Sequence, residues 1–564
     1  MTTLVARPQR TRHQGVRQQS IAVAHQRLML LMLLFAAAAA VITVRLLWLT
    51  VDSGGRAAPP PVTGLMARGD IVDRNGDVLA RTIEAWSIGV HPDRLLGRPE
   101  ELAPQLARLM PERSEAEYLA ILRSGKSFTY LRRRAMPELV AAVNALGEPG
   151  MAYAREPERL YPQVTLAAHV VGYTDFDGRG VMGMERVLDS RLNDPLYRGK
   201  PVALSIDRRV QAAMESELSA AMVNLRALGA TGIVLDVDTG EVLAMVSLPV
   251  FNPNKSGEAL PDARRNNVTQ SVYELGSTFK PLALATALDT GVASLERRVD
   301  ATSPIPVGRF RISDDHAQSR WLNIAETLVH SSNIATARFA DEVGQARMEH
   351  LFRNLGFHEP PHVELRERGR TLWPQSWGRV TTMTVAYGHG IAVTPLHLAS
   401  AYAALVNGGI WRPATLMKVA PGKAAAGRRV YSEETSATMR KLMRLIVTDG
   451  TGKRANVEGF RIGGKTGTAE KPGAGGYSRT VNVSTFAAAF PMDRPRYVVI
   501  AMLDAPKGSP ESFGQTTAAY TAAPVVAKVI ARTGPMLGVI PDVNRDVDLS
   551  DVTPLLWKNS KEAQ

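Results

Sequence analysis

The chain has 564 residues, which is enough for several domains with large hydrophobic cores. Hydrophobic residues make up 45% and charged residues 21%, which excludes wholesale disorder, and the absence of cysteine excludes disulfide scaffolds, thiolate metal sites and cysteine nucleophiles. The net charge of +13 would suit a nucleic-acid-binding protein, but six arginines and no acidic residue lie within the first 45 residues. The remaining residues carry only +7, so we expect no nucleic-acid partner.

An apolar segment near the N-terminus predicts a membrane anchor. Residues 28–44 contain no charge, and the apolar run continues past Arg45 to Leu49. A helix over 28–49 would be roughly 33 Å long, which matches the hydrocarbon thickness of a bilayer. Since the arginine-rich residues 1–27 come first, the positive-inside rule places them in the cytoplasm and the rest of the chain outside. A cleaved signal peptide is the alternative, but the apolar stretch continues beyond its alanine run.

The exported part begins with a linker and a first domain. Residues 50–66 are rich in Gly and Pro and predict the linker, which leads into a domain at 67–200. Within this domain, Asn75-Gly76 between two apolar runs predicts a β-hairpin, and residues 98–148 have helical periodicity.

The second domain, residues 201–540, has an order of elements that indicates an α+β fold with an antiparallel sheet. Residues 201–207 predict a strand that leads into a helix from Arg208, and residues 238–240 predict the turn of a hairpin. Further helices are predicted at 278–355, 395–408 and 516–532, and further strands at 459–469, 481–490 and 496–504. Residues 541–564 predict a polar C-terminal tail.

The first candidate site motif is Ser277-Thr278-Phe279-Lys280, the only Ser-x-x-Lys in the chain. Pro281 lacks an N–H and is tolerated in the first turn of a helix, so we expect a helix to begin at about Ser277. The serine would then lie at the positive end of the helix dipole, which suits an oxyanion, with Lys280 on the same face. A neutral Lys280 would accept the serine proton if burial or a second cation lowers its pKa. A solvated helix start is the alternative interpretation.

The second candidate motif is Ser331-Ser332-Asn333, the only Ser-x-Asn in the chain. It lies inside or between two apolar helical segments, where polar side chains usually have a partner or a function. A capping or turn element is the alternative interpretation.

The third candidate motif, Lys465-Thr466-Gly467-Thr468, follows a predicted strand. An edge strand presents free backbone groups, and Gly467 would let a substrate backbone approach closely. Lys465 would supply a second cation beside Lys280. Because strand alternation places Lys465 and Thr468 on opposite faces, we expect Thr468 to contribute its backbone N–H.

Three other patterns do not support a function. Residues 459–466 match a phosphate-binding loop, but glycine and proline follow where that loop needs a helix. Residues 358–362 match the zinc-protease pattern, but two interior prolines prevent the helix that would align the histidines. Lys255-Ser256-Gly257 resembles the third motif but lies in a predicted loop. We therefore expect no cofactor and no metal ion.

The three motifs, in this order, resemble those of the penicillin-binding proteins and serine β-lactamases. The resemblance extends to class B penicillin-binding proteins through further stretches, namely Arg68-Gly69, Asp73-Arg74-Asn75-Gly76, Arg159-x-Tyr161-Pro162, His169-x-x-Gly172, Gly183-x-Glu185 and Tyr387–Pro395. Within the class, the chain is most similar to the division-specific transpeptidases of Gram-negative bacteria. The resemblance covers roughly residues 65–535 and implies an α+β penicillin-binding transpeptidase fold, with an antiparallel sheet flanked by helices. This fold would stand on an elongated N-terminal pedestal domain and carry one N-terminal transmembrane helix.

The resemblance also implies a mechanism at the matching positions. Ser277 would attack the carbonyl of the penultimate D-alanine in a peptidoglycan stem peptide, and Lys280 would accept its proton. The oxyanion would lie between the backbone N–H groups of Ser277 and Thr468. An amine on a neighbouring stem peptide would then attack the acyl-enzyme and form the crosslink.

The other motif residues receive supporting roles from the same resemblance. Ser331 would carry a proton to the departing D-alanine with the help of Lys465, and Asn333 would orient the substrate amide and Lys280. The predicted substrate-binding residues are Thr466, Gly467 and Thr468, with the two threonines holding the terminal carboxylate.

The resemblance implies several partners. These are stem peptides as D-Ala-D-Ala donor and amine acceptor, penicillin and other β-lactams, a polytopic membrane glycosyltransferase and other division proteins. The expected location is the inner membrane at the division septum, with the bulk of the chain in the periplasm. An elongation-specific transpeptidase, a membrane-anchored D,D-carboxypeptidase or β-lactamase, and a non-catalytic penicillin sensor are the alternatives.

Overall fold

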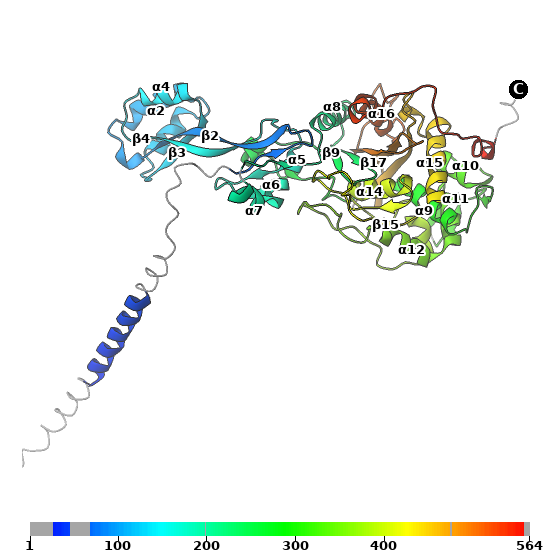
Figure 1. Ribbon diagram of the computed structural model, residues 1–564, viewed down its shortest axis with the longest axis horizontal. Coiled ribbons are helices and arrows are strands. Elements are labelled where there is room, and N and C mark those ends of the chain that lie inside the picture. The colour runs from blue at the N-terminus through cyan, green and yellow to red at the C-terminus, as the bar shows by residue number, and fades with distance from the viewer. Residues whose placement is uncertain (1–25, 46–67, 198, 309, 474–475, 558–564) are drawn as a thin grey trace, which may run out of the picture. The chain divides into compact units, whose positions relative to one another are not determined.

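The structure is a computed structural model that describes residues 26–45, 68–197, 199–308, 310–473 and 476–557 (Figure 1). It divides into two units, residues 1–66 and 67–564. In the first unit, the exposed helix Gln26–Arg45 is long and apolar enough to cross a membrane, which fits the predicted anchor. The remainder of the predicted basic tail, the last four anchor positions and the predicted linker lie outside the described residues.

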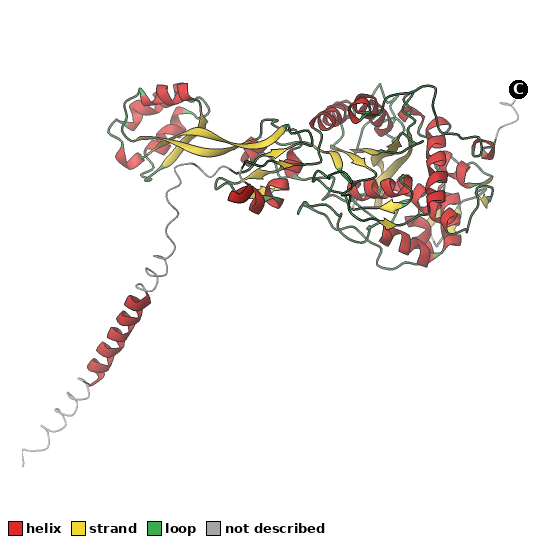
Figure 2. Ribbon diagram, in the orientation of Figure 1, coloured by secondary structure: helices red, strands yellow, loops and turns green. Residues whose placement is uncertain are grey.

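The pedestal is built on a five-stranded sheet around the long strand β2 (Figure 2). Strand β2 pairs with β1 near its start, with β4 along most of its length and with β3 at its far end. The hairpin predicted at Asn75-Gly76 is confirmed, because the Asp73 carboxylate accepts the N–H groups of Asn75 and Asp77 in the turn. The strands of this sheet are β1 (Ile71–Val72), β2 (Val78–Val90), β3 (Thr129–Ala135), β4 (Met151–Leu160) and β7 (Val202–Ala203).

Three helices pack over the far end of the pedestal sheet and enclose a hydrophobic core of their own. They are α2 (Pro99–Leu109), α3 (Glu115–Leu122) and α4 (Pro137–Asn144). The prediction of helix throughout 98–148 is wrong at Thr129–Ala135, which forms strand β3. Thr129 and Tyr130 favour strands, and Leu131 and Ala135 lie an even number of residues apart, so both bury on the face that meets the core.

A buried ion cluster joins the segments that carry the pedestal motifs. Glu185 is fully buried, and its two carboxylate oxygens lie 2.7 Å from Arg68 Nε and 2.7 Å from Arg159 Nε. Arg68 also pairs with Asp189 at 2.6 Å. The pedestal is completed by α5 (Ala168–Val171), α6 (Gly183–Val187), α7 (Asp189–Asn193) and the hairpin of β5 (Tyr173–Thr174) and β6 (Gly180–Met182). The cluster thus fixes residues over a hundred positions apart in the sequence.

The predicted catalytic part, residues 201–540, is built on an antiparallel sheet in the order β16-β17-β18-β8-β9. Its strands are β8 (Gly229–Asp236), β9 (Val242–Leu248), β16 (Gly463–Gly473), β17 (Gly476–Phe490) and β18 (Tyr497–Asp504). The predicted hairpin at 238–240 and the three predicted strands between 459 and 504 are confirmed, with shifted ends. Strand β7 pairs in parallel with β1, so the catalytic part and the pedestal share a sheet.

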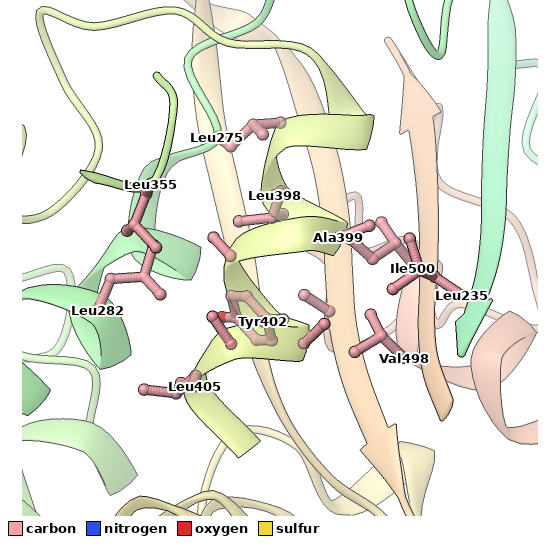
Figure 3. Packing of buried hydrophobic residues seen from close by; sticks show 14 of the residues in the cluster. Leu235, Leu275, Leu282, Leu355, Leu398, Ala399, Tyr402, Leu405, Val498 and Ile500 are labelled. Atoms are coloured by element: carbon pink, nitrogen blue, oxygen red, sulfur yellow. The ribbon is translucent and has the colours of Figure 1, made fainter. Parts of the chain in front are cut away.

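The two faces of the central strand β18 supply two hydrophobic cores. Val498 and Ile500 point to one core, where they pack against α14 (Pro395–Val406; Figure 3). Val499 and Leu503 point to the other core, beneath α8 (Arg208–Asn224) and α16 (Ala522–Thr533). Because both faces are covered, β18 is a continuous apolar run and not an alternating one. The sheet is therefore a rigid central layer between two sets of helices.

Helices cover both faces of this sheet (Figure 1). They are α8 (Arg208–Asn224), α9 (Lys280–Asp289), α10 (Ile324–Val329), α11 (Asn333–Val343), α12 (Gln345–Asn354), α13 (Arg379–Val385), α14 (Pro395–Val406), α15 (Glu433–Thr448) and α16 (Ala522–Thr533). The prediction of helix over 278–355 is wrong between α9 and α10, where four short strands form two ribbons: β10 (Val299–Asp300), β11 (Ile305–Val307), β12 (Phe310–Ile312) and β13 (Trp321–Leu322). A further ribbon pairs β14 (Ile410–Trp411) with β15 (Arg428–Arg429).

The described part of the predicted polar tail, residues 541–557, packs against the catalytic part. Asp546 pairs with the buried Arg444 of α15 at 2.5 Å, and the Leu555 carbonyl accepts the Asn323 side-chain amide at 2.8 Å. The Trp557 N–H donates to the fully buried Glu326 at 3.0 Å. The described residues of the predicted polar tail therefore have partners on the surface of the catalytic part.

The substitution Glu185→Gln tests the pedestal ion cluster. It removes the charge that faces two buried arginines while keeping the side-chain volume. We expect a loss of about 3–5 kcal/mol in the free energy of unfolding, measured by urea titration of the purified chain. Glu138→Gln, on the exposed surface of α4, is the matched control. Equal stability of the two variants would contradict a stabilising role of the cluster.

Candidate active site

Ser277 lies in a tight turn directly before a helix. Residues Gly276–Phe279 form a 3-10 turn, and α9 begins at Lys280 with Pro281 in its first turn. The α-helix therefore begins one 3-10 turn after the predicted start at Ser277. Ser277 is half-buried, and its hydroxyl has no hydrogen-bond partner within the part of the chain that the structure describes. The hydroxyl is thus free to meet a ligand.

Three neighbouring segments hold this turn in place. A Cβ atom at Gly467 of β16 would lie 2.5 Å from the Leu275 carbonyl oxygen and 2.7 Å from Cγ2 of Thr278. On another side, a Cβ atom at Gly388 would collide with the backbone of Gly276. Tyr402 of α14 donates its hydroxyl hydrogen to the Thr278 carbonyl at 2.8 Å. We expected Gly467 to let a substrate backbone approach closely, and in the structure the side on which its side chain would stand faces the Ser277 turn.

Two lysines and one serine form the centre of the site. Lys280 Nζ lies 3.2 Å from Ser331 Oγ and also donates to the Ser331 carbonyl oxygen. From the other side, Lys465 Nζ donates to Ser331 Oγ at 2.9 Å and to the Thr466 carbonyl oxygen at 3.1 Å. Both lysines are fully buried. The structure thus brings together residues from three motifs that span almost two hundred positions.

Burial controls the charge of the two amines. It lowers the pKa of Lys280 to about 7, while the negative charges of Asp314 and Asp315 act in the opposite direction. Burial also lowers the pKa of Lys465, and the nearby charge of Lys280 lowers it further. A neutral amine beside a protonated one is therefore accessible near neutral pH, which is the state that a base-and-acid pair requires.

The Ser331 loop adopts an unusual backbone conformation. Ser331 lies between α10 and α11 with φ of +58°, a left-handed conformation that costs free energy in a residue with a side chain. Ser332 caps α11 and donates to Asp314 Oδ2 at 2.7 Å, and the Ile334 N–H donates to Asp314 Oδ1 at 2.9 Å. Asp314 therefore fixes this loop. Sequence reasoning missed it, because no local motif links residue 314 to residue 332.

Asn333 differs from its predicted contact. Its side-chain amide donates to the Ser313 carbonyl oxygen at 2.9 Å. Within the described residues, no hydrogen bond joins Asn333 to Lys280, which the sequence analysis expected it to orient. Asn333 lies at the start of α11, two residues from Ser331, so its amide borders the site from the Asp314 side.

The two threonines of the third motif bind different partners. Thr466 Oγ1 lies 2.9 Å from Thr451 Oγ1 and accepts from Lys465 Nζ at 3.1 Å. Thr468 Oγ1, two residues further along the strand, accepts the Ala518 N–H at 3.1 Å. Sequence reasoning missed Thr451 and the residues around Ala518, which lie 15 and 50 positions away from their partners.

The structure shows the local conformation of the three rejected patterns. Residues 459–466 run into strand β16 and not into a helix, and residues 358–362 form a turn and loop. Among the described residues, no group of three or more His, Asp and Glu side chains could hold a metal ion. Lys255-Ser256-Gly257 forms part of the 3-10 helix Pro253–Glu258.

Comparisons with known proteins agree with this geometry. Residues 230–531 match the penicillin-binding protein transpeptidase domain, and residues 65–193 match the penicillin-binding protein dimerisation domain. The probable peptidoglycan D,D-transpeptidase FtsI of Caulobacter vibrioides is 43% identical over 84% of this chain and 82% of its own length. FtsI of Escherichia coli K12, named a peptidoglycan D,D-transpeptidase, is 28% identical over 84% of each protein.

Solved structures give the same result. The crystal structure of penicillin-binding protein 3 from Mycobacterium tuberculosis in complex with aztreonam has a TM-score of 0.66 and 27% sequence identity. The match covers 84% of this chain and 97% of that protein. The matches span both the pedestal and the catalytic part. The chain therefore belongs to the class B penicillin-binding protein family and is a D,D-transpeptidase.

Proposed function

We propose that this enzyme crosslinks peptidoglycan stem peptides at the division septum through an acyl-enzyme on Ser277. The observation that carries the assignment of residues is the convergence of Lys280 and Lys465 on Ser331 beside the Ser277 turn. Relatives named as peptidoglycan D,D-transpeptidases supply the substrate class, and complexes of a relative with aztreonam and ampicillin supply the inhibitor class.

In the acylation step, Ser277 Oγ attacks the carbonyl carbon of the penultimate D-alanine. Lys280, in its neutral form, accepts the hydroxyl proton, and the negative charge on the carbonyl oxygen is stabilised by the backbone N–H groups of Ser277 and Thr468. The Thr468 carbonyl oxygen lies 3.1 Å from where a Cβ atom at Gly276 would stand, which supports the adjacency of these two backbone segments.

The bond to the terminal D-alanine then breaks, and its nitrogen receives a proton through Ser331. The Ser331 oxygen accepts hydrogen bonds from both lysines, which leaves its own proton available to the leaving amine. Lys465 replaces that proton. In the second half, an amine of another stem peptide attacks the acyl-enzyme carbonyl, and its surplus proton passes through Ser331 to Lys465. The ester bond to Ser277 then breaks, and Lys280 returns its proton to the Ser277 oxygen.

The third motif provides a polar binding site for the terminal carboxylate. Thr466 and Thr468 lie on the edge strand β16, with Gly467 between them facing the Ser277 turn. The Thr466 hydroxyl is hydrogen-bonded to the Thr451 hydroxyl and accepts from Lys465, so it is positioned before substrate binds. Asn333 borders the opposite wall, where it would meet the substrate amide.

The sequence and the anchor helix together indicate how the protein is placed in the membrane. We infer a single-pass inner-membrane protein with residues 1–27 in the cytoplasm and the pedestal (67–200), the transpeptidase domain (201–540) and the tail (541–564) in the periplasm. A polytopic glycosyltransferase is the proposed membrane partner, together with other division proteins.

Loss of the Ser277 hydroxyl tests the nucleophile. We expect Ser277→Ala to abolish covalent labelling by a fluorescent penicillin, whereas the wild-type label persists for many minutes on a denaturing gel. Ser294→Ala, which alters an exposed serine, is the control and should label normally. Labelling that survives in Ser277→Ala would contradict the assignment, and rapid loss of the wild-type label would indicate a β-lactamase.

The low pKa of Lys280 predicts a pH dependence of acylation. The neutral amine is the reactive form, so the acylation rate constant should fall as pH drops below about 7 and level off above it. The measurement is the rate of penicillin acylation between pH 5.5 and 9. His330, the adjacent histidine whose pKa burial lowers, is a competing explanation, so His330→Gln is the control. A transition that disappears in His330→Gln would assign the titration to the histidine.

The contact between β16 and the nucleophile turn predicts the effect of Gly467→Ala. The added methyl group would displace the turn by its contacts with Leu275 and Thr278. We expect acylation to slow by about 100-fold, since small displacements of reacting groups have effects of this order. Gly378→Ala is the control, because a Cβ atom there meets no neighbour within 4 Å. Normal acylation in Gly467→Ala would show that the turn does not depend on this contact.

A further inference from the structure

A cavity of about 500 Å³ lies between the pedestal and the segment that follows β9. Its walls are the end of β4, the β5–β6 hairpin and the 3-10 helix Pro253–Glu258, so it also contains the Lys255-Ser256-Gly257 tripeptide. Asn254 joins the walls: its amide donates to the Tyr161 carbonyl at 2.9 Å, and its carbonyl oxygen accepts from the Tyr161 N–H and from Arg134 Nη1, both at 3.0 Å. The cavity is therefore built from fixed parts and lies outside the site around Ser277.

The lining of the cavity has an excess of positive charge. It includes five cationic and three acidic side chains. Arg134 pairs with Glu158, and Lys255 pairs with Glu258. The half-buried Arg264 guanidinium has no hydrogen bond or ion pair among the residues that the structure describes. An unpaired guanidinium in a cavity suits a carboxylate, which it can bind through two parallel hydrogen bonds.

A buried arginine in the wall gives independent evidence for an anionic ligand. Arg159 is 6% exposed, and its Nη2 atom is buried without a hydrogen-bond partner in the described part of the chain. The Nε atom of Arg133, another lining residue, also lacks a hydrogen bond, and the nearest carboxylate oxygen of Glu158 lies 3.7 Å from it. Buried donors normally have partners, so these two are an exception in the wall of one cavity.

An aromatic ring stands at the same cavity. Phe176 is 87% exposed, and the Arg133 guanidinium lies 5.5 Å from its ring centroid. The same guanidinium lies 5.0 Å from the ring of Tyr130, which packs against Phe128 at 4.8 Å, so a row of π groups follows β3 to the cavity. An exposed phenyl ring bordered by charged groups suits the apolar face of a sugar, whose hydroxyls would reach the carboxylates of the lining.

We propose that this cavity binds a glycan strand of uncrosslinked peptidoglycan, with a sugar face on Phe176 and a stem-peptide carboxylate on Arg264. The proposal rests on the proposed function for the identity of the polymer. It adds a second binding site on the polymer that the active site modifies. An acidic polypeptide would use the cations but has no sugar face to cover Phe176, so the glycan strand accounts for more of the lining.

The test uses the full-length chain in detergent, with Ser277 first acylated by penicillin so that the active site is blocked. Binding of fluorescent, peptide-bearing, uncrosslinked glycan strands is measured by anisotropy for the wild type, Phe176→Ala and Arg264→Gln. We expect each variant to bind at least tenfold more weakly. Tyr197→Ala is the matched control, because Tyr197 is an exposed pedestal aromatic with Arg191 stacked on it at 5.3 Å, and it should bind normally.

Two further arms separate the possible outcomes. Strands stripped of their peptides should keep the dependence on Phe176 and lose the dependence on Arg264. Polyglutamate that binds in place of the strands, with the same variant dependence, would overturn the proposal in favour of an acidic polypeptide. An acylated wild type that binds no strand would also overturn the proposal. The rate of penicillin acylation is recorded for every variant: normal acylation without strand binding contradicts the cavity proposal alone, whereas absent acylation in the wild type contradicts the proposed function.

Discussion

The site depends on the burial of two amines around one hydroxyl. An isolated ammonium transferred into a protein interior loses several kcal/mol of solvation, and two of them in contact also repel. Lys280 and Lys465 are both fully buried and both donate to Ser331 Oγ. Desolvation and mutual repulsion therefore favour states in which at most one of the two amines is protonated. The fold therefore maintains a proton donor and a proton acceptor side by side. Any rearrangement that admitted water would return both lysines to the charged state.

Rigid strands and helices keep the two lysines buried. Lys465 projects from the edge strand of a sheet whose central strand β18 is covered on both faces, and Lys280 begins a buried helix. The connection between them is direct, because Gly467 of β16 meets the Ser277 turn and Tyr402 of the central helix α14 donates a hydrogen bond to the Thr278 carbonyl of that turn. The left-handed Ser331 is the one strained member of the centre, and Asp314 holds the loop that carries it. Chemistry that needs sub-ångström placement is thus supported by backbone contacts.

Sequence patterns predicted the parts of the site that depend on residues close together in the chain. The spacing from Ser277 to Lys280 is readable because Pro281 sets the helix start, and the alternation along β16 correctly separates Lys465 from Thr468. The sheet strands were predicted because their apolar runs are strong. The role of Gly467, the partner of Asn333 and the contributions of Asp314 and Thr451 could not be predicted, because each depends on a chain segment that only tertiary packing brings near. Strand β3 was misread as helix because helical segments flank it on both sides and hid its few strand-favouring residues, which pairing with β2 holds in a strand.

Two of the Lys-x-Gly tripeptides show that the function of a short motif depends on where it lies in the fold. Lys465-Thr466-Gly467 lies on a sheet edge, where the lysine is buried and the glycine meets another backbone. Lys255-Ser256-Gly257 lies on a 3-10 helix, where the lysine is exposed and pairs with Glu258, and a Cβ atom at the glycine would meet no neighbour. The second lysine keeps its hydration. Burial, which the tripeptide does not encode, converts one of two similar sequences into an acid–base group and leaves the other as a surface charge at a binding cavity.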